Sequence, residues 1–470
     1  MRNILKQVLI ILFFGYSINC FSQFRPKEIN WTADGNTYLT VDEGNIVLTD
    51  IASNKESILI KKEQLIPEGK TTPLSFDIFN LSADKNKLLI YTNTAKVWRY
   101  NTRGDYWLLN IPANKLIQLG KGRPSQSLMF AKISPDAQKA AYVSENNIFV
   151  EDLASHQVTQ ITKDGTRKLI NGTFDWVYEE EFECRDGFRW SPDSKQIAFW
   201  QVNATKIRDY YMLNTTDSVY SQVISVEYPK VGEPPSSVRI GVINTGTANV
   251  KSMDIPGDPQ QHYLPIMEWA ANSDELVVQQ LNRKQNESRL FYCNVSDGTS
   301  KNFYIERDST WIDIKSRWNE EPMGWDWINN NREFLWVSEK DGWRHIYRVS
   351  RDGKKETLIT KGKYDIAAIK SIDEKGNYLY FMASPGNATQ LYLYRTKLNG
   401  KGLLELVSPR GLEGMHEYNI SPDSKFAVHS FSNFQTYPAR EWISLPDHKA
   451  LDERKSIANT MKKIEGNRVE

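Results

Sequence analysis

Three consecutive glutamates, Glu179, Glu180 and Glu181, lie within the segment 175–182, whose sequence DWVYEEEF surrounds them with aromatic and branched apolar residues. An ordinary acidic turn on a protein surface is instead surrounded by polar, flexible residues, and such a solvated turn is the alternative to a functional site here. Carboxylates in an aromatic frame are partly desolvated and held in place, so they attract a cation more strongly than solvated carboxylates do. The segment therefore predicts a cation-binding site.

Two neighbouring carboxylates can converge on one ligand only where the backbone departs from strand geometry, because adjacent strand residues point to opposite faces. We therefore expect a bulge or a short helical turn at Glu180 and Glu181, and Asn171-Gly172 just upstream permits such a departure. Close carboxylates also repel each other, so a nearby cation is needed to keep both ionised. Asp175 and Glu179 are expected to support the motif or to lie at the surface.

A repeated turn motif indicates the scaffold that positions these residues. An apolar or aromatic residue is followed by two spacers and a turn residue and then by an alternating strand, most clearly at 133–136, 190–193 and 420–423. Proline and aspartate favour a tight turn in this pattern, since proline fixes φ and aspartate bonds its own backbone. The turn residue recurs at positions 34, 84, 136, 193, 272, 330, 375 and 423.

This repeat predicts the fold class. Four strands in roughly 50 residues make one blade of a β-propeller, and the chain carries eight copies of the turn. We expect an all-β fold, an eight-bladed β-propeller of four-stranded antiparallel blades over residues 24–445. A series of β-sandwiches with coincidental turns is the alternative.

One interval between turns is too long for a blade. The stretch from 193 to 272 holds roughly 25 residues more than the repeat requires, and the excess falls at 209–235, which contains Tyr228-Pro229-Lys230. Insertions at blade edges commonly carry function on a rigid scaffold. We expect an extended arm in this segment.

The N-terminus reads as a targeting segment. A basic start, an apolar run over residues 8–18 and small residues before Gln23 are typical of an export signal, so residues 1–22 are predicted to be a signal peptide and the mature chain to be periplasmic or secreted. A plain membrane anchor is one alternative. Lipid attachment at Cys20, which would leave the chain membrane-associated, is another.

Charge and cysteine content argue against several functions. A net charge of +1 gives no reason to expect nucleic acid as a partner. Cys184 and Cys293 are too few for a disulfide scaffold, and no Cys/His spacing resembles a zinc site. The six histidines are scattered along the sequence and are expected to be structural or exposed. We expect no metal and no other cofactor.

The segment 175–182 closely resembles the double-glutamate motif in the propeller of dipeptidyl peptidase IV-like serine peptidases. Three further segments resemble family segments in the family's order, namely FRWSPD at 188–193, VEYPK at 226–230 and DGWRHIY at 341–347. The resemblance covers residues 24–455. It implies that Glu180 and Glu181 bind the free α-ammonium group of a peptide.

The resemblance implies further site residues. Arg99, in the segment KVWRY at 96–100, is similar to a family arginine that contacts substrate, and it is the candidate for the cation that the carboxylates need. An ordinary strand-surface arginine is the alternative. Trp318, in RWNEEP at 317–322, is implied to line the same pocket. In the family a comparable arm helps to form the dimer, which implies a homodimer through 209–235.

The family carries its catalysis in a C-terminal α/β-hydrolase domain, whose signature is a Gly-x-Ser-x-Gly nucleophile elbow followed by aspartate and histidine. No Gly-x-Ser-x-Gly occurs in this sequence. Residues 446–470 are interpreted as a linker or helix toward a hydrolase domain that the chain lacks. We therefore expect the chain alone to hydrolyse nothing, since the triad is absent.

Two functions of different class remain open. The first is the substrate-binding propeller of a dipeptidyl peptidase IV-like serine exopeptidase, which anchors the peptide ammonium for a catalytic domain absent from this chain. The second is a stand-alone exported propeller that binds peptide N-termini or a protein partner without catalysis. The expected partners are peptides with a free N-terminus and a separate α/β-hydrolase domain. A bare interaction scaffold, which would not need the framed glutamates, is a third and plainer interpretation.

Overall fold

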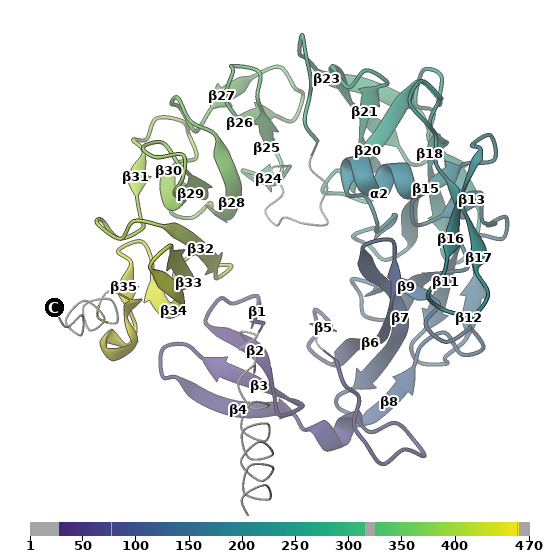
Figure 1. Ribbon diagram of the computed structural model, residues 1–470, viewed down its shortest axis with the longest axis horizontal. Coiled ribbons are helices and arrows are strands. Elements are labelled where there is room, and N and C mark those ends of the chain that lie inside the picture. Colours follow the sequence, from purple (N-terminus) through teal and green to yellow (C-terminus); the bar gives the residue numbers. More distant parts are fainter. Residues whose placement is uncertain (1–27, 77, 315–324, 458, 460–470) are drawn as a thin grey trace, which may run out of the picture.

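The computed structural model describes residues 28–76, 78–314, 325–457 and 459, and it shows blades of antiparallel strands arranged in a ring (Figure 1). Eight blades, numbered here in chain order, make up the ring. The predicted all-β, eight-bladed β-propeller of four-stranded blades is confirmed, with one additional strand in blade four.

The first four blades contain the following elements. Blade one holds β1 (Asn30–Trp31), β2 (Thr37–Asp42), β3 (Asn45–Asp50) and β4 (Lys55–Ile60), followed by the 3-10 helix η1 (Lys62–Leu65). Blade two holds β5 (Ile78–Leu81), β6 (Lys87–Val97), β7 (Tyr100–Asn110) and β8 (Lys115–Gln118). Blade three holds β9 (Leu128–Ile133), β10 (Lys139–Ser144), β11 (Asn147–Asp152) and β12 (Val158–Gln160). Blade four holds β13 (Leu169–Asn171), helix α2 (Trp176–Phe182), β14 (Phe188–Trp190), β15 (Gln196–Asn203), β18 (Ser237–Asn244) and β19 (Val250–Ser252), with β16 (Asp209–Asn214) and β17 (Gln222–Glu227) inserted.

The last four blades are more regular. Blade five holds β20 (His262–Trp269), β21 (Glu275–Asn282), β22 (Glu287–Asn294) and β23 (Ser300–Arg307). Blade six holds β24 (Trp327–Ile328), β25 (Glu333–Ser338), β26 (His345–Ser350) and β27 (Glu356–Leu358). Blade seven holds β28 (Ile366–Asp373), β29 (Tyr378–Ala383), β30 (Tyr392–Lys397) and β31 (Glu405–Leu406). Blade eight holds β32 (Met415–Ile420), β33 (Phe426–Asn433), β34 (Thr436–Ser444) and β35 (Lys449–Ala450), and the 3-10 helix η2 (Glu453–Lys455) follows.

The turn motif found in the sequence has a common hydrogen-bond pattern. In blade four the Ser191 hydroxyl donates to Asp193 (2.6 Å) and accepts from the backbone N–H of Gln196 (2.9 Å). The next residue, Ser194, is left-handed with φ of 63°. The same serine–aspartate bond recurs at Ser134 and at Ser421. Each of the eight predicted positions lies between two paired strands of one blade, so the motif sets the register of the repeat.

Blades two and three are joined at one point, where β7 meets β9 in a single residue pair, Gly104 with Leu128. Gly104 has no room for a side chain, because a Cβ there would lie 2.5 Å from the ring of Tyr91. Sequence repeats did not predict this junction.

The ring closes through aromatic side chains. Tyr38 of blade one stacks on Trp442 of blade eight with ring centroids 4.5 Å apart, and Trp31 meets the same indole edge-on at 5.7 Å. Trp31 also donates a hydrogen bond to Asn419 (2.6 Å). Across the described residues, no strand pairing joins blade one to blade eight. Side-chain packing therefore forms this seam.

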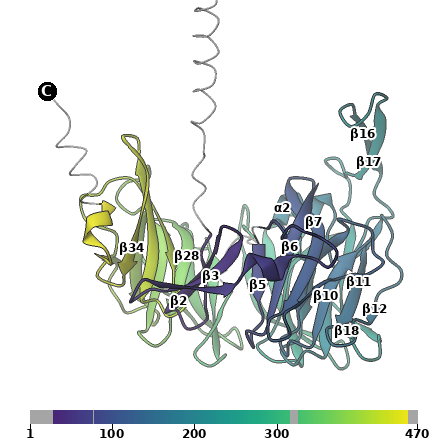
Figure 2. The same cartoon turned by 90° about the horizontal axis from the view of Figure 1, so that it is seen from below.

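An arm projects from blade four. Strands β16 and β17 pair only with each other and rise above the ring (Figure 2). Apolar side chains on the arm are largely exposed, among them Tyr211 and Leu213. The predicted extended arm at 209–235 is confirmed.

Blade eight extends past residue 445, the predicted end of the propeller. Strand β35 follows residue 445 and completes blade eight, while the predicted signal peptide at 1–22 and the last residues, 460–470, lie outside the described residues. In the portion of the chain that the structure describes, no helix has the length and apolar character needed to span a bilayer.

Candidate functional site

The glutamate motif forms a short helix, α2, whose ends are fixed by its own sequence. The Asp175 carboxylate caps the helix by accepting hydrogen bonds from the backbone N–H of Tyr178 (3.1 Å) and from the Ser236 hydroxyl (2.6 Å). Glu183 ends the helix in the left-handed region, with φ of 55°. Of the two predicted departures from strand geometry, the structure shows the helical turn.

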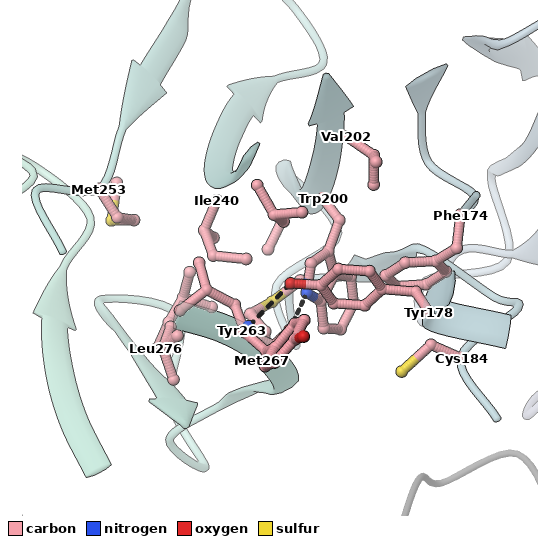
Figure 3. Packing of buried hydrophobic residues seen from close by; sticks show 14 of the residues in the cluster. Phe174, Tyr178, Cys184, Trp200, Val202, Ile240, Met253, Tyr263, Met267 and Leu276 are labelled. Atoms are coloured by element: carbon pink, nitrogen blue, oxygen red, sulfur yellow. Dashed lines mark hydrogen bonds between the residues drawn. The ribbon is translucent and has the colours of Figure 1, made fainter. Parts of the chain in front are cut away.

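The apolar residues of the motif fix α2 to blades four and five. Tyr178 and Phe182 are buried in a cluster that spans both blades. Figure 3 shows Tyr178 within this cluster. The Tyr178 hydroxyl accepts a hydrogen bond from the backbone N–H of Leu264 (3.0 Å), and the Trp200 indole donates to the carbonyl of the same residue (2.7 Å). Burial raises the pKa of Tyr178 well above its ordinary value. These contacts anchor one face of α2, and the three glutamates, spaced about 100° apart around the helix, point in different directions from it.

The three glutamates have different environments. Glu179 is buried beside Arg185, with 3.5 Å between carboxylate and guanidinium, and burial raises the pKa of Glu179 to about 7. Glu180 is half-buried and accepts a hydrogen bond from Arg99 (2.9 Å). Glu181 is exposed, and the described residues offer it neither a hydrogen bond nor an ion pair. The motif therefore contains one buried, one paired and one open carboxylate.

Arg99 reaches Glu180 from blade two at the tip of the β6–β7 hairpin, which extends toward α2 (Figure 1). Both strands are eleven residues long, and Trp98 adopts φ of 52° to close the turn. The bond to Glu180 raises the pKa of Arg99. The structure thus brings together two of the predicted site residues, Arg99 and Glu180, from positions 81 residues apart.

Glu181 faces a cavity of about 780 Å³. The base of the arm supplies one wall, where Tyr228 packs against Trp176 of α2 with ring centroids 4.2 Å apart. Tyr263 of blade five and Trp311, which follows β23, also line the cavity. Sequence reasoning placed Tyr228 in the arm but missed its role as a cavity wall. Trp318, the remaining predicted site residue, lies outside the described residues.

A second cluster of titratable residues lies in blade eight. His429, Glu441 and His448 present possible metal-ligating atoms within 4.8 Å of one another, so this is where the described residues could hold a metal ion. Strand register explains part of the convergence, since His429 of β33 pairs directly with Glu441 of β34. The scattered histidines of the sequence did not show it. Aligning the second and third strands of the eighth repeat would have placed His429 opposite Glu441.

Hydrogen bonds account for the core of this cluster without an ion. His416 donates from Nε2 to the carbonyl of Leu412 (2.8 Å), so its Nδ1 faces His429 Nε2 (2.8 Å), and His429 Nδ1 faces Glu441 (2.7 Å). These three contacts give both ring nitrogens of His416 and of His429 a hydrogen-bonding partner. The other Glu441 oxygen accepts from the backbone of Ile457 (3.0 Å).

Comparisons with known proteins agree with this architecture. Residues 82–438 match the family model described as the dipeptidyl peptidase IV (DPP IV) N-terminal region. A probable dipeptidyl-aminopeptidase B of Pyrenophora teres f. teres is 25% identical, over 92% of this chain and 52% of the relative. Dipeptidyl-aminopeptidase B of Aspergillus niger is 27% identical, over 84% of this chain and 46% of the relative. The chain spans about half the length of the curated relatives it matches.

The fold is also found in solved structures. The crystal structure of Porphyromonas gingivalis dipeptidyl peptidase 4 superposes with a TM-score of 0.81 at 24% identity, covering 93% of this chain and 61% of that chain. A structure described as a putative dipeptidyl aminopeptidase IV from Bacteroides ovatus gives a TM-score of 0.70 at 19% identity, covering 92% and 60%. At these identities the likeness establishes the fold.

Proposed function

Because the chain belongs to the family of dipeptidyl peptidase IV N-terminal regions, we propose that it is the peptide-binding propeller of a dipeptidyl peptidase IV-type serine exopeptidase. In this proposal Glu180 and Glu181 bind the free α-ammonium group of a peptide. The observation that carries it is the open carboxylate of Glu181 at the wall of an aromatic cavity, next in sequence to the Glu180–Arg99 pair.

The chemistry of an ammonium group suits this site. An ammonium has three N–H donors and one positive charge, and each carboxylate offers acceptors of opposite charge. Glu180 uses one oxygen to accept from Arg99, and its second oxygen remains as an acceptor for a ligand. Glu181 is exposed and lines a cavity with Trp176, Tyr228 and Tyr263, so a ligand can reach its carboxylate from solvent while contacting aromatic side chains. An acetylated amine lacks both the charge and the donors.

Fixing the ammonium would set the distance to the bond that is cut. In the proposed assembly an α/β-hydrolase domain supplies the serine, histidine and aspartate, and dipeptides with Pro or Ala at their second position leave by acyl transfer. This chain supplies the anchor and performs no hydrolysis alone. We propose that it acts after export, and that the apolar arm of β16 and β17 pairs two copies.

Calorimetric titration with Ala-Pro-Ala tests the proposal directly. We expect the free peptide to bind, the N-acetylated peptide to bind at least about 100-fold more weakly, and the double variant Glu180→Gln/Glu181→Gln to lose the difference between the two. Equal affinity for free and acetylated peptide, or wild-type affinity in the double variant, would overturn it. Tyr437→Ala is a suitable control, because this exposed side chain lies in β34 of blade eight.

A further inference from the structure

We propose that Tyr100, Arg185 and Glu179 are positioning residues that clasp the tip of the β6–β7 hairpin onto α2 and thereby hold Arg99 against Glu180. The inference rests on the proposed peptide site but assigns a role to residues outside it. Neither the double-glutamate motif nor the predicted site residues include Tyr100 or Arg185. Glu179, the first glutamate of the motif, acquires a role different from that of its two neighbours.

The contacts of Arg185 carry the proposal. Its guanidinium carbon lies 3.6 Å from the centroid of the Tyr100 ring, and its Nε lies 3.5 Å from Glu179. The side chains of Arg185 and Glu179 are 2% and 7% exposed. The Thr173 hydroxyl holds the backbone of Arg185 by donating to its carbonyl (3.0 Å). A cation over an aromatic face is attracted more strongly when it is desolvated, as this one is.

Two successive hairpin residues therefore grip two partners on blade four. Arg99 bonds to Glu180 on the helix, while Tyr100 covers Arg185 three residues beyond its end. Glu179 and Glu180 are neighbours, so the contacts form a closed loop that includes both chain segments. A single contact would allow the tip to pivot. Two contacts fix its rotation and hence the direction of the Arg99 side chain.

The strand pairing in the stem of the β6–β7 hairpin is irregular, so it alone does not fix the position of the tip. The register of β6 with β7 shifts between Thr92 and Ala95 and again between Ala95 and Lys96. Such bulges leave a ladder locally unpaired and bend it. The tip therefore lies beyond an irregular stem, and its position depends on what it contacts at α2.

The clasp should depend on pH because Glu179 pairs with Arg185 only when it is ionised. Its pKa is raised to about 7 by burial, and the charged groups that face it are Arg185, which lowers the pKa, and Glu180, which raises it. Acidification below about pH 7 protonates Glu179 and weakens its hold on Arg185. Above about pH 8 the peptide amine itself loses its charge. Binding should therefore peak between these limits.

Hydrogen–deuterium exchange and peptide affinity together test the clasp. In Tyr100→Ala and Arg185→Met we expect faster amide exchange at the hairpin tip, residues 96–103, in the absence of peptide. If the tip then docks in about one molecule in ten, the affinity for Ala-Pro-Ala falls about tenfold. Tyr100→Phe keeps the ring and should restore both readouts. Glu179→Gln should remove the acidic limb of the binding profile and leave the alkaline limb.

The outcomes separate the clasp from the proposed function. Unchanged exchange at the tip in both Tyr100→Ala and Arg185→Met overturns the clasp, whatever the peptide does. Faster exchange at the tip together with full peptide affinity overturns the claim that the clasp positions Arg99 for the ligand. Faster exchange in a protein whose wild type binds no peptide supports the clasp as a fixture of the hairpin and overturns the proposed function instead.

Discussion

The glutamate helix of blade four and the histidine cluster of blade eight both place carboxylates next to cationic or protonated groups, but they differ in what is left over. In blade eight the Glu441 carboxylate is bonded on one side to His429 and on the other to the backbone of Ile457. In blade four Glu180 is paired with Arg99, whereas Glu181 faces a cavity. Both oxygens of Glu441 therefore have hydrogen-bond partners, whereas Glu181 is accessible to a ligand.

The difference shows how to distinguish a structural polar cluster from a binding site. A buried polar group that lacks a partner costs free energy, so a cluster that only stabilises the fold satisfies each of its members. A binding site keeps acceptors free where solvent can reach them until the ligand arrives. By this criterion we expect the blade-eight cluster to stabilise the fold and the blade-four site to bind the proposed ligand.

We expect the largest effect, a loss of stability, when a substitution disrupts the histidine cluster of blade eight. Glu441→Ala removes the acceptor of a buried pair and leaves His429 without a partner at Nδ1. Removing one partner of a buried pair costs about 3 kcal/mol or more in free energy of unfolding. Urea denaturation would measure it, with Glu417→Ala on the exposed face of β32 as the control. A loss below about 1 kcal/mol would contradict the assignment of the cluster to stability.

The next largest effect should be on peptide affinity, and it distinguishes the role of blade four from that of blade eight. Glu180→Gln/Glu181→Gln keeps the shape of both side chains and removes their charges. We expect the peptide affinity to fall about 100-fold, which corresponds to about 2.7 kcal/mol, with the urea midpoint nearly unchanged. A large loss of stability with intact binding would reverse the roles assigned to blades four and eight.

Acidification should destabilise blade eight. Burial lowers the pKa of His416 and of His448 to about 4, below the ordinary value of 6.5, so the unfolded chain binds these protons first as the pH falls. The pKa of Glu441 is also lowered, chiefly by its bond to His429 against the effect of burial, so its contribution is lost at the acidic end. With two such histidines, stability should fall by about 2 kcal/mol per pH unit between about pH 6.5 and 4.

Urea titrations at several pH values measure this slope. His448→Phe removes one of the two histidines and should make the slope shallower over the same range. An identical slope in the variant would show that other groups govern the acid sensitivity.

The smallest expected effect is on the peptide affinity of a variant at Arg99, beside the open carboxylate of Glu181. Arg99→Lys keeps a positive charge at the hairpin tip but loses the planar guanidinium that meets Glu180. Since the Arg99 side chain is largely exposed, we expect only about a fivefold loss in peptide affinity. Calorimetry would detect it. A loss as large as that of the double glutamate variant would indicate that Arg99 contacts the ligand more directly than its pairing with Glu180 implies.

The repeat and the glutamate motif were readable from the sequence because both are local. A turn such as Ser191-Pro192-Asp193 contains its own hydrogen bonds, and the framed glutamates are consecutive. The prediction of a bulge or a short helical turn followed from the requirement that Glu180 and Glu181 bind one ligand.

Other features depend on contacts between distant segments and could not be read in the same way. The cover of Tyr100 over Arg185 joins blade two to blade four, and the wall that Tyr228 forms against Trp176 depends on how the arm leaves its blade. The histidine cluster needs the register of three strands. No single window of sequence contains these pairings.

The aromatic seam has a mechanical consequence. Each blade comes from one continuous stretch of the chain, so a force that pulls the two ends of the ring apart acts first on the contact between blades one and eight. Three rings and one indole hydrogen bond resist it there, at Trp31, Tyr38 and Trp442, whereas every other junction is also crossed by the chain itself. Under tension the circle would open into an arc before any blade lost its strands.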